Sequence, residues 1–242
     1  MIILYTDFSQ LGPYVGQLKS VIYQHNPGSK IIDLMHDAPM FDVKHSAYLL
    51  NSLTPYFTNE SVFCCVVDPG VGGARKNIVV KADDKHYIGP DNGLFEYIIR
   101  SASKLEYYTI SWEPEVLSTT FHGRDIYAPI AAQIDSGIFE EIKKIEPKDI
   151  TRFNWPNDLL EIIYIDSFGN LMTGIRATSI DIESILHIKG EKVYFSKTYT
   201  TMPDGQVCWY VNSNGLIEIA LNKDNAGLKY DIKIGETVGF LV

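Results

Sequence analysis

The sequence has 242 residues, of which 45% are hydrophobic and 21% charged, and its formal net charge is −9. This composition is typical of a globular protein of one or two domains, with a core large enough to fold without disulfide bonds. The longest apolar stretches are only as long as strands, so no membrane span is predicted. An acidic chain without a basic stripe also argues against a nucleic-acid partner.

The cysteines and the N-terminus indicate where such a protein works. Cys64, Cys65 and Cys208 form no CxxC pair, and their odd number predicts no disulfide framework. The apolar residues 1–5 are cut short by Asp7, so no signal peptide is predicted there. We therefore expect a protein of the reducing cytoplasm.

The first part of the chain alternates between segments with the apolar patterns of strands and of helices. Strands are predicted at residues 2–6, 30–35 and 61–67, and helices at residues 14–23, 42–53 and 126–134. Asp42 and Asp125 are the expected N-caps of the last two helices. Such alternation predicts βαβ units around a mostly parallel sheet, layered as in a Rossmann-like α/β fold.

The pattern changes after a cluster of helix- and strand-breaking residues at positions 154–158. Short strands separated by polar, glycine-containing turns are predicted at residues 161–166, 192–195, 207–212, 216–220 and 237–242. This pattern is typical of a smaller all-β, barrel-like domain. We therefore predict an α/β domain over residues 1–155 and a β-barrel-like domain over residues 156–242.

Two aspartates follow predicted strands of the first domain. In an open α/β sheet, ligands bind beyond the carboxyl ends of the strands, which is where Asp7 and Asp68 are expected. A carboxylate there can accept hydrogen bonds from both hydroxyls of a ribose. The alternative interpretation is that each carboxylate caps the turn or helix that follows it.

A glycine-rich loop and a histidine could complete a site. Three glycines and a proline separate Asp68 from Arg75, so the loop can fold tightly enough for the two charges to pair in a pocket. His122 lies in the loop that precedes the predicted helix at residues 126–134. The alternatives are an ordinary surface loop and a structural histidine.

The second domain offers a further candidate segment. Asp166 ends a predicted strand, and it is followed by Phe168 and Asn170, an aromatic ring that can stack on a purine and an amide that can bind a base edge. The alternative is a β-turn with a core phenylalanine. Residues 212–215 predict a hairpin turn, for which a purely structural role is the simplest interpretation.

Together these stretches resemble the S-adenosyl-L-methionine (SAM) hydroxide adenosyltransferases, or SAM hydrolases, a family once known only as a domain of unknown function and related to the fluorinases and chlorinases. The resemblance runs in order through residues 6–8, 14–16, 68–75, 90–94, 121–129, 166–173 and 212–220. It implies an enzyme that hydrolyses SAM, a small-molecule substrate, to adenosine and methionine without a cofactor. It also implies a homotrimer, with sites between the N-terminal domain of one subunit and the C-terminal domain of the next.

The resemblance assigns roles to individual residues. Asp68, Arg75 and His122 surround the attacking water, with His122 positioning the water or taking its proton and Asp68 holding the other two side chains. The implied substrate-binding residues are Asp7, Phe41, Phe121, Asp166, Phe168, Asn170, Tyr199 and Ser213. Among them, Asp7 is expected to hold the ribose diol and Phe41 to line the ribose region. Phe168 and Tyr199 sandwich the adenine and Asn170 binds its edge, whereas Asp166 and Ser213 hold the amino-acid group of methionine.

Some features separate this chain from its implied relatives. Ser9, Gly12 and Gly174 stand where the family commonly has Gly, Asp and Asn. The halogenases resemble this pattern but replace the acid at position 68 with Tyr and the His-Gly pair with other residues, and the fluorinases carry a long insertion after the arginine. This chain keeps the hydrolase set and lacks the insertion, which favours water over halide. A halide-using adenosyl enzyme and a non-enzymatic nucleoside sensor are the alternatives.

A metal site is the remaining possibility to weigh. The chain has side chains of types that bind metals: Asp7, His36, Asp68, His122 and Asp125. Their spacing matches no metal-binding motif, so we predict no metal site.

Overall fold

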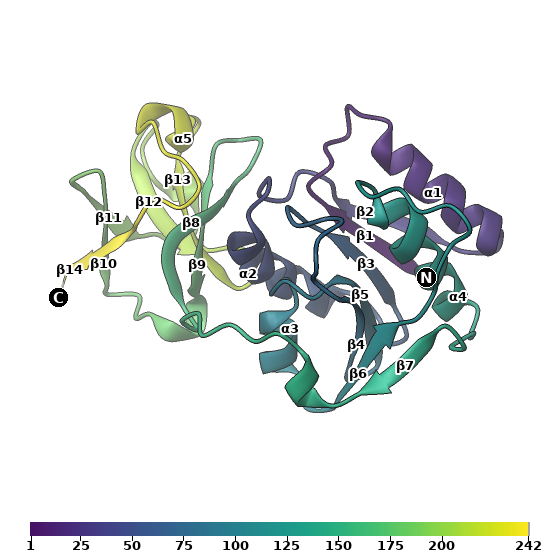
Figure 1. The fold of residues 1–242 in the computed structure, drawn as a ribbon. Coiled ribbons are helices and arrows are strands. Elements are labelled where there is room, and N and C mark those ends of the chain that lie inside the picture. Colours follow the sequence, from purple (N-terminus) through teal and green to yellow (C-terminus); the bar gives the residue numbers. More distant parts are fainter. Residues whose placement is uncertain (242) are drawn as a thin grey trace. The chain divides into compact units, whose positions relative to one another are not determined.

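The computed structural model describes residues 1–241 and consists of two compact units (Figure 1). The first unit ends at Phe153 and the second begins at Asn154. Each unit contains its own seven-stranded sheet. Among the described residues, no helix is both long and apolar enough to cross a lipid bilayer.

The sheet of the first unit is mixed, with the strand order β2-β1-β3-β5-β4-β6-β7. Its strands are β1 (Ile2–Thr6), β2 (Ile31–Met35), β3 (Val62–Val66), β4 (Asn77–Ala82), β5 (Lys85–Pro90), β6 (Leu105–Ile110) and β7 (Ile142–Ile145). Neighbours from β2 to β5 are parallel, whereas β4, β6 and β7 pair antiparallel. The expectation of a mostly parallel sheet is therefore corrected: β4 and β5 are joined by the tight turn at Asp83 and Asp84, which leaves no room for a crossover helix.

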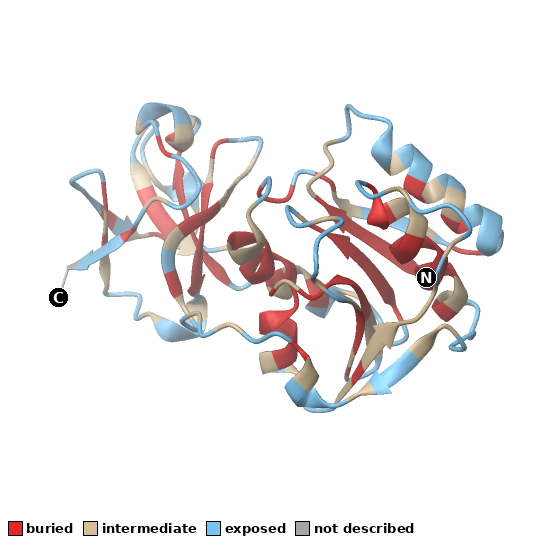
Figure 2. Ribbon diagram, viewed as in Figure 1, coloured by how far each residue is buried: buried red, intermediate tan, exposed pale blue. Residues whose placement is uncertain are grey.

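Two layers of helices cover this sheet. The helices of the first unit are α1 (Tyr14–His25), α2 (Val43–Leu53), α3 (Glu96–Ser101) and α4 (Ala128–Asp135), with one-turn segments at Thr54–Tyr56 and Pro147–Asp149. Alternate residues of β1 face opposite layers: Ile2 and Leu4 pack in the core with α1 and α4, and Ile3 and Tyr5 in the core with α2 and α3. Figure 2 shows the buried strands between these layers.

Of the two predicted helix N-caps, one is confirmed and the other is wrong. Asp42 caps α2 by accepting a hydrogen bond from the backbone N–H of His45, as expected. Asp125 does not cap a helix. It lies inside a π-helical turn, Gly123–Tyr127, that precedes α4, and its carboxylate accepts from the backbone N–H of Ser118 instead.

The second unit is a nearly closed barrel, with the strand order β14-β10-β11-β12-β13-β9-β8. Its elements are β8 (Leu159–Ile165), β9 (Leu171–Arg176), β10 (Ile185–Ile188), β11 (Glu191–Phe195), β12 (Val207–Val211), β13 (Leu216–Leu221), β14 (Gly239–Leu241), α5 (Ala226–Lys229) and the one-turn segments Ala177–Ser179 and Tyr199–Thr201. All neighbours are antiparallel except β11 and β12. The strand predicted at residues 237–242 corresponds to β14, and residue 242 lies outside the described residues.

Backbone hydrogen bonds close this sheet on itself. The segment before β14 pairs with β8, because the N–H groups of Ile162 and Val238 donate to Glu236 and Leu160 at 2.8 and 2.9 Å. Trp209, fully buried on β12, lies in the apolar core of the unit. Gly174 on β9 is part of this packing, since a Cβ there would lie 2.6 Å from the Cβ of Leu159 on β8. This close approach of the two strands accounts for the glycine at position 174.

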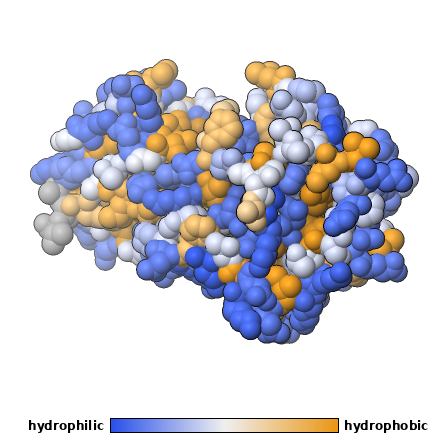
Figure 3. All heavy atoms as spheres, viewed as in Figure 1, coloured by the Kyte–Doolittle hydropathy of each residue, from blue (hydrophilic) through white to orange (hydrophobic). Residues whose placement is uncertain are grey.

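Hydrophobic groups are interspersed with hydrophilic ones on the face drawn in Figure 3. Several large apolar side chains are exposed in each unit, among them Leu11, Met40 and Phe41 in the first and Phe168 in the second. Single exposed apolar groups are ordinary on protein surfaces. Met40, Phe41 and Phe168 differ from such groups because each lines a pocket.

Candidate active site

A pocket of about 350 Å³, here called the first pocket, lies beyond the carboxyl ends of β1 and β3. These strands are parallel neighbours with Thr6 opposite Val66, so the residues that follow them meet at one edge of the sheet. Asp7 and Asp68 both line the pocket, together with three further residues predicted for the site: Phe41, Phe121 and His122. The fold thus gathers groups that are far apart in the sequence.

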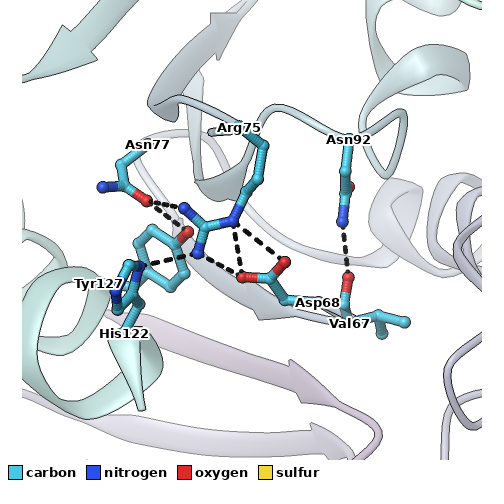
Figure 4. Close-up of polar contacts among 7 residues, drawn as sticks. All are labelled: Val67, Asp68, Arg75, Asn77, Asn92, His122 and Tyr127. Atoms are coloured by element: carbon cyan, nitrogen blue, oxygen red, sulfur yellow. Dashed lines mark hydrogen bonds and ion pairs between the residues drawn. The ribbon is translucent and has the colours of Figure 1, made fainter. Parts of the chain in front are cut away.

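Asp68 and Arg75 form a buried ion pair beside this pocket (Figure 4). Arg75 Nε donates to the two carboxylate oxygens at 3.1 and 3.0 Å, and Nη2 donates to Oδ2 at 2.5 Å. The side chains of Arg75 and Asp68 are only 10% and 3% exposed. Such a two-pronged arrangement fixes the plane of the guanidinium as well as its position.

The geometry determines the tautomer of His122. Nη2 of Arg75 lies 2.8 Å from Nδ1 of His122, and a guanidinium has N–H donors but no acceptor. Nδ1 must therefore accept, and the proton of the neutral ring must be on Nε2. Burial and the nearby positive charge of Arg75 lower the pKa of His122, which favours the same neutral form.

This network is completed by two residues that the sequence did not indicate. Asn77, the first residue of β4, accepts a hydrogen bond from Nη1 of Arg75 at 2.8 Å through Oδ1. The hydroxyl of the buried Tyr127 donates to the same oxygen at 2.7 Å. Figure 4 shows both residues beside Arg75. It also shows Asn92, whose side-chain amide donates a hydrogen bond of 2.9 Å to the backbone carbonyl of Val67, the residue after β3.

The loop that carries Arg75 lies directly against the loop that carries His122. Gly72 has a positive φ of 77°, and a Cβ built there would lie 2.3 Å from the carbonyl oxygen of Thr119. Only glycine permits both the left-handed conformation and this approach. The loop glycines therefore do more than allow a tight turn, because they bring two parts of the site together.

The carboxylate of Asp7 is fixed by a backbone hydrogen bond at the edge of the first pocket. Its Oδ2 accepts a hydrogen bond from the backbone N–H of Phe41 at 3.0 Å. Partial burial and, to a smaller extent, the negative charge of Asp68 raise the pKa of Asp7. Phe41 and the nearby Ser9 have positive φ angles of 59° and 62°. Two non-glycine residues in the left-handed region beside one carboxylate mark a locally strained segment, a feature that clusters at functional sites.

Aromatic rings form one wall of the first pocket. Phe8, Tyr14 and Phe121 pack against one another with centroids 5.4 to 5.9 Å apart, in tilted or edge-to-face geometry. Tyr14 is the first residue of α1, so this helix contributes to the site although it carries none of the predicted catalytic groups. Gly12, three residues from Ser9, lies next to this ring, since a Cβ there would be 3.3 Å from Tyr14.

A second pocket, of about 370 Å³, lies in the second unit. It is lined by Phe168, Asn170 and Tyr199, together with Leu221, Lys223, Asp224 and Asn225. Phe168 is 75% exposed and Tyr199 42% exposed. The structure thus brings together the three residues expected to bind a base, and two of them present exposed rings.

Asp166 and Ser213 are placed differently. The carboxylate of Asp166 accepts from the backbone N–H groups of Phe168 and Asn170, both at 2.9 Å, and from the Asn170 amide at 3.0 Å. Asp166 therefore shapes the turn that carries Phe168, and it orients Asn170. Ser213 lies in the exposed turn between β12 and β13 and is outside the lining of the second pocket. Their expected contacts with a methionine group stay predictions.

No metal cluster is evident in the described part of the chain. Among residues 1–241, no group of three or more His, Cys, Asp or Glu side chains is arranged to hold a metal ion. The ligand types noted in the sequence are instead paired individually: His36 with Thr6 and Asp33, and Asp125 with Arg124.

Comparison with known proteins gives a consistent result along the chain. Residues 2–145 match the family model described as the SAM hydroxide adenosyltransferase N-terminal domain, and residues 160–239 match the one described as the C-terminal domain. A protein of Methanocaldococcus jannaschii named (R)-S-adenosyl-L-methionine hydrolase is 35% identical, covering 93% of this chain and 90% of its own. A protein of Actinoplanes named fluorinase is 25% identical, covering 96% and 94% of the two chains.

A solved structure resembles the fold over its full length. The crystal structure of an uncharacterized conserved protein from Thermotoga maritima superimposes with a TM-score of 0.90 at 28% sequence identity. The match covers 100% of both chains. The two-unit architecture is therefore shared with an experimentally determined protein.

Proposed function

We propose that this chain, which belongs to the SAM hydroxide adenosyltransferase family, hydrolyses SAM to adenosine and L-methionine. The observation that carries the proposal is the hydrogen-bonded set of Asp68, Arg75 and His122 at a pocket that also contains Asp7. This set places a carboxylate, a cation and a neutral imidazole beside one space, which suits the activation of a water molecule.

The reaction is a displacement at C5′ of the ribose. The water oxygen forms a bond to C5′ while the C5′–S bond breaks, and its electron pair goes to sulfur. Because the leaving group is a neutral thioether departing from a sulfonium cation, it needs no proton from the enzyme. The water must lose one proton, so the demand on the protein is to hold and activate the nucleophile in line with the C5′–S bond.

The tautomer of His122 refines the roles of these side chains. With Nδ1 accepting from Arg75, the ring offers an N–H donor at Nε2 and has no second lone pair for a proton. We therefore assign His122 to orienting the water by donation, and Asp68, the carboxylate of the set, to accepting its proton. Arg75 compensates the negative charge that develops as the water becomes hydroxide-like.

Substrate binding divides between the two pockets in this proposal. Asp7 accepts hydrogen bonds from the ribose hydroxyls in the first pocket. The adenine ring stacks between Phe168 and Tyr199 in the second pocket, where Asn170 lies at its edge. The exposed rings of the second pocket support this assignment, because a stacked base would cover apolar surface that otherwise faces water.

The alternative is transfer of the adenosyl group to a halide. The lower identity to the fluorinase than to the SAM hydrolase favours water, and so does the retention of Asp68 and His122. The test is chromatographic: purified protein is incubated with SAM, with and without chloride, and adenosine and 5′-chloro-5′-deoxyadenosine are followed. His122→Ala is compared with His25→Ala, a matched change at an exposed histidine of α1.

Each result of this test has a definite meaning. Adenosine that forms in proportion to wild-type protein, is lost with His122→Ala and persists with His25→Ala establishes the hydrolase. Chloro-nucleoside in place of adenosine moves the chain to the halogenases. Folded wild-type protein that binds adenosine but leaves SAM intact is a nucleoside sensor, and the proposed activity is then wrong.

Assembly and location belong to the same proposal. The family resemblance supports a homotrimer whose active sites combine the first unit of one subunit with the second unit of the next. Mixing Asp68→Asn with Phe168→Ala subunits, assayed at SAM concentrations well below the raised KM of Phe168→Ala, tests this, because sites with two intact halves arise only in mixed trimers. Recovery of activity on mixing supports shared sites, and its absence in trimers shown to be mixed contradicts them. The three free, buried cysteines support a reducing cytosolic location.

A further inference from the structure

Nη1 of Arg75, which does not reach Asp68, donates to Asn77, and Tyr127 holds Asn77 in turn. Asn77 Oδ1 accepts from Nη1 of Arg75 at 2.8 Å and from the hydroxyl of Tyr127 at 2.7 Å. Neither Asn77 nor Tyr127 is among the residues that line the first pocket. The pair therefore reaches the reacting atoms only through Arg75.

The direction of every hydrogen bond in this chain follows from chemistry. Because Arg75 can only donate, Asn77 must present its oxygen, and that oxygen can only accept. The hydroxyl of Tyr127 must therefore donate, and burial raises its pKa well above the usual range, so it keeps its proton. On the other arm, Nη2 of Arg75 donates to His122. The network thus runs from Tyr127 to the imidazole without an ambiguous proton.

The π-helical turn makes this arrangement sterically possible. His122 immediately precedes the turn and Tyr127 is its last residue, five positions along the chain. In an α-helix, residues five apart point about 140° away from each other. The wider turn, in which the N–H of Ala128 bonds to the carbonyl of Gly123, brings both side chains to Arg75 and its partner Asn77 (Figure 4).

We propose that Asn77 and Tyr127 are positioning residues for the hydrolysis. They fix the guanidinium of Arg75 so that Nη2 is shared between Asp68 and His122, and they thereby hold His122 in its Nε2–H tautomer. This inference rests on the proposed function. It adds two residues, and a proton arrangement, that the motif of Asp68, Arg75 and His122 does not contain.

Replacing Tyr127 with Phe tests the contribution of the hydroxyl. The ring stays in the core and only the bond to Asn77 is lost, so we expect kcat to fall roughly tenfold and KM for SAM to change less than about twofold. Tyr5→Phe is the matched control, because Tyr5 is equally buried and its hydroxyl donates at 3.0 Å to the carbonyl of Ser46 instead. We expect kcat of the control within about twofold of wild type.

A second variant and a spectroscopic measurement make the test independent of one mutant. Asn77→Leu removes the acceptor for both Arg75 and Tyr127, so kcat should fall further than in Tyr127→Phe. Nitrogen NMR of labelled histidine in the wild-type protein should show Nδ1 of His122 without a proton and Nε2 with one. Tyr127→Phe and Asn77→Leu should populate the other tautomer.

The outcomes separate this inference from the proposed function. Wild-type protein that forms no adenosine contradicts the hydrolysis, whereas the tautomer is measured without turnover. Wild-type-like kcat in folded Tyr127→Phe and Asn77→Leu, in a protein that does hydrolyse SAM, overturns the positioning role. A protonated Nδ1 in the wild type overturns it even if neither variant folds. An equal loss of kcat in Tyr5→Phe assigns the effect to core packing and overturns it as well.

Discussion

The two pockets are built in opposite ways. In the first, Asp68, Arg75 and His122 are buried and bonded side chain to side chain, so each group has one position before any ligand is present. In the second, Phe168 and Tyr199 are exposed rings on turns. Under the proposed function, the groups that act on the reacting atom are fixed in advance, whereas the groups that contribute stacking gain their contacts from the ligand.

This contrast predicts different kinetic effects for the two pockets. Changes in the first pocket should appear mainly in kcat, because they disturb groups aimed at the transition state. Changes in the second should appear mainly in KM, because stacking is equal in the ground and transition states. The following variants test this division.

Asp68→Asn should have the largest effect. The amide keeps the size of the side chain but removes the charge that balances Arg75, so we expect kcat to fall about 10³-fold. Loss of one partner of a buried ion pair should also lower the free energy of unfolding by about 3 kcal/mol. Steady-state kinetics and thermal unfolding measure the two effects. Adenosine binding by calorimetry should persist, and its loss would contradict a purely catalytic role.

Phe168→Ala should act on affinity. Loss of one stacking face should cost about 1–3 kcal/mol, a rise in KM of roughly 5- to 150-fold, while kcat stays within about threefold of wild type. Because the ring is exposed, the melting temperature should not change. Tyr194→Ala is the control, as Tyr194 is an exposed aromatic residue of β11 outside the second pocket. A fall in kcat equal to the rise in KM would break the division between the pockets.

Lowering the pH should have a smaller effect on kcat than the Asp68→Asn substitution. The pKa of His122 lies below its ordinary value of 6.5, and only the neutral ring can accept from Arg75. We therefore expect kcat to be constant above pH 6.5 and to fall only at lower pH, and the fall should be missing from the residual activity of His122→Gln. Stability should decrease over the same interval, because the unfolded state takes up the proton first as the pH drops. An acid limb centred above pH 6.5 would contradict the assigned environment of His122.

Ser9→Gly should have the smallest effect. Ser9 has a φ of 62°, where a side chain costs about 1–2 kcal/mol, and glycine adds roughly 0.5–1 kcal/mol of entropy to the unfolded state. We expect the net free energy of unfolding to rise by about 0.5 kcal/mol, measured by denaturant titration. Ser9→Ala keeps the Cβ and should give no such rise.

The sequence predicted the first pocket well where local chemistry decides the position. Residues after parallel strands meet at one edge of a sheet, which is why Asp7 and Asp68 were placed correctly from apolar strands and their ends. The second pocket was anticipated through Phe168, Asn170 and Tyr199, but only the family resemblance indicated that these residues meet. Their spacing in the sequence carries no such information.

Other features depended on contacts that no local pattern encodes. The hairpin of β4 and β5 was not predicted, because its Asp83-Asp84 turn lacks the glycine of the strongest hairpin signals. Tyr127 was missed for a different reason. Helical periodicity places it on the opposite side from His122, and no residue type marks a π turn. Asn77 is an ordinary first residue of a strand until Arg75 is placed beside it.

The π turn at Gly123–Tyr127 also limits how this chain can change length. Such a turn spans more residues than the α-helical turn that it replaces. Deleting one residue from it would rotate everything beyond by about 100° relative to His122. The same deletion would move the fully buried Ala128 and Ala131 of α4 out of their positions in the core. Because the core sets the rotation on one side and the site sets it on the other, descendants of this protein can vary residues of the turn other than Tyr127 but not the number of its residues.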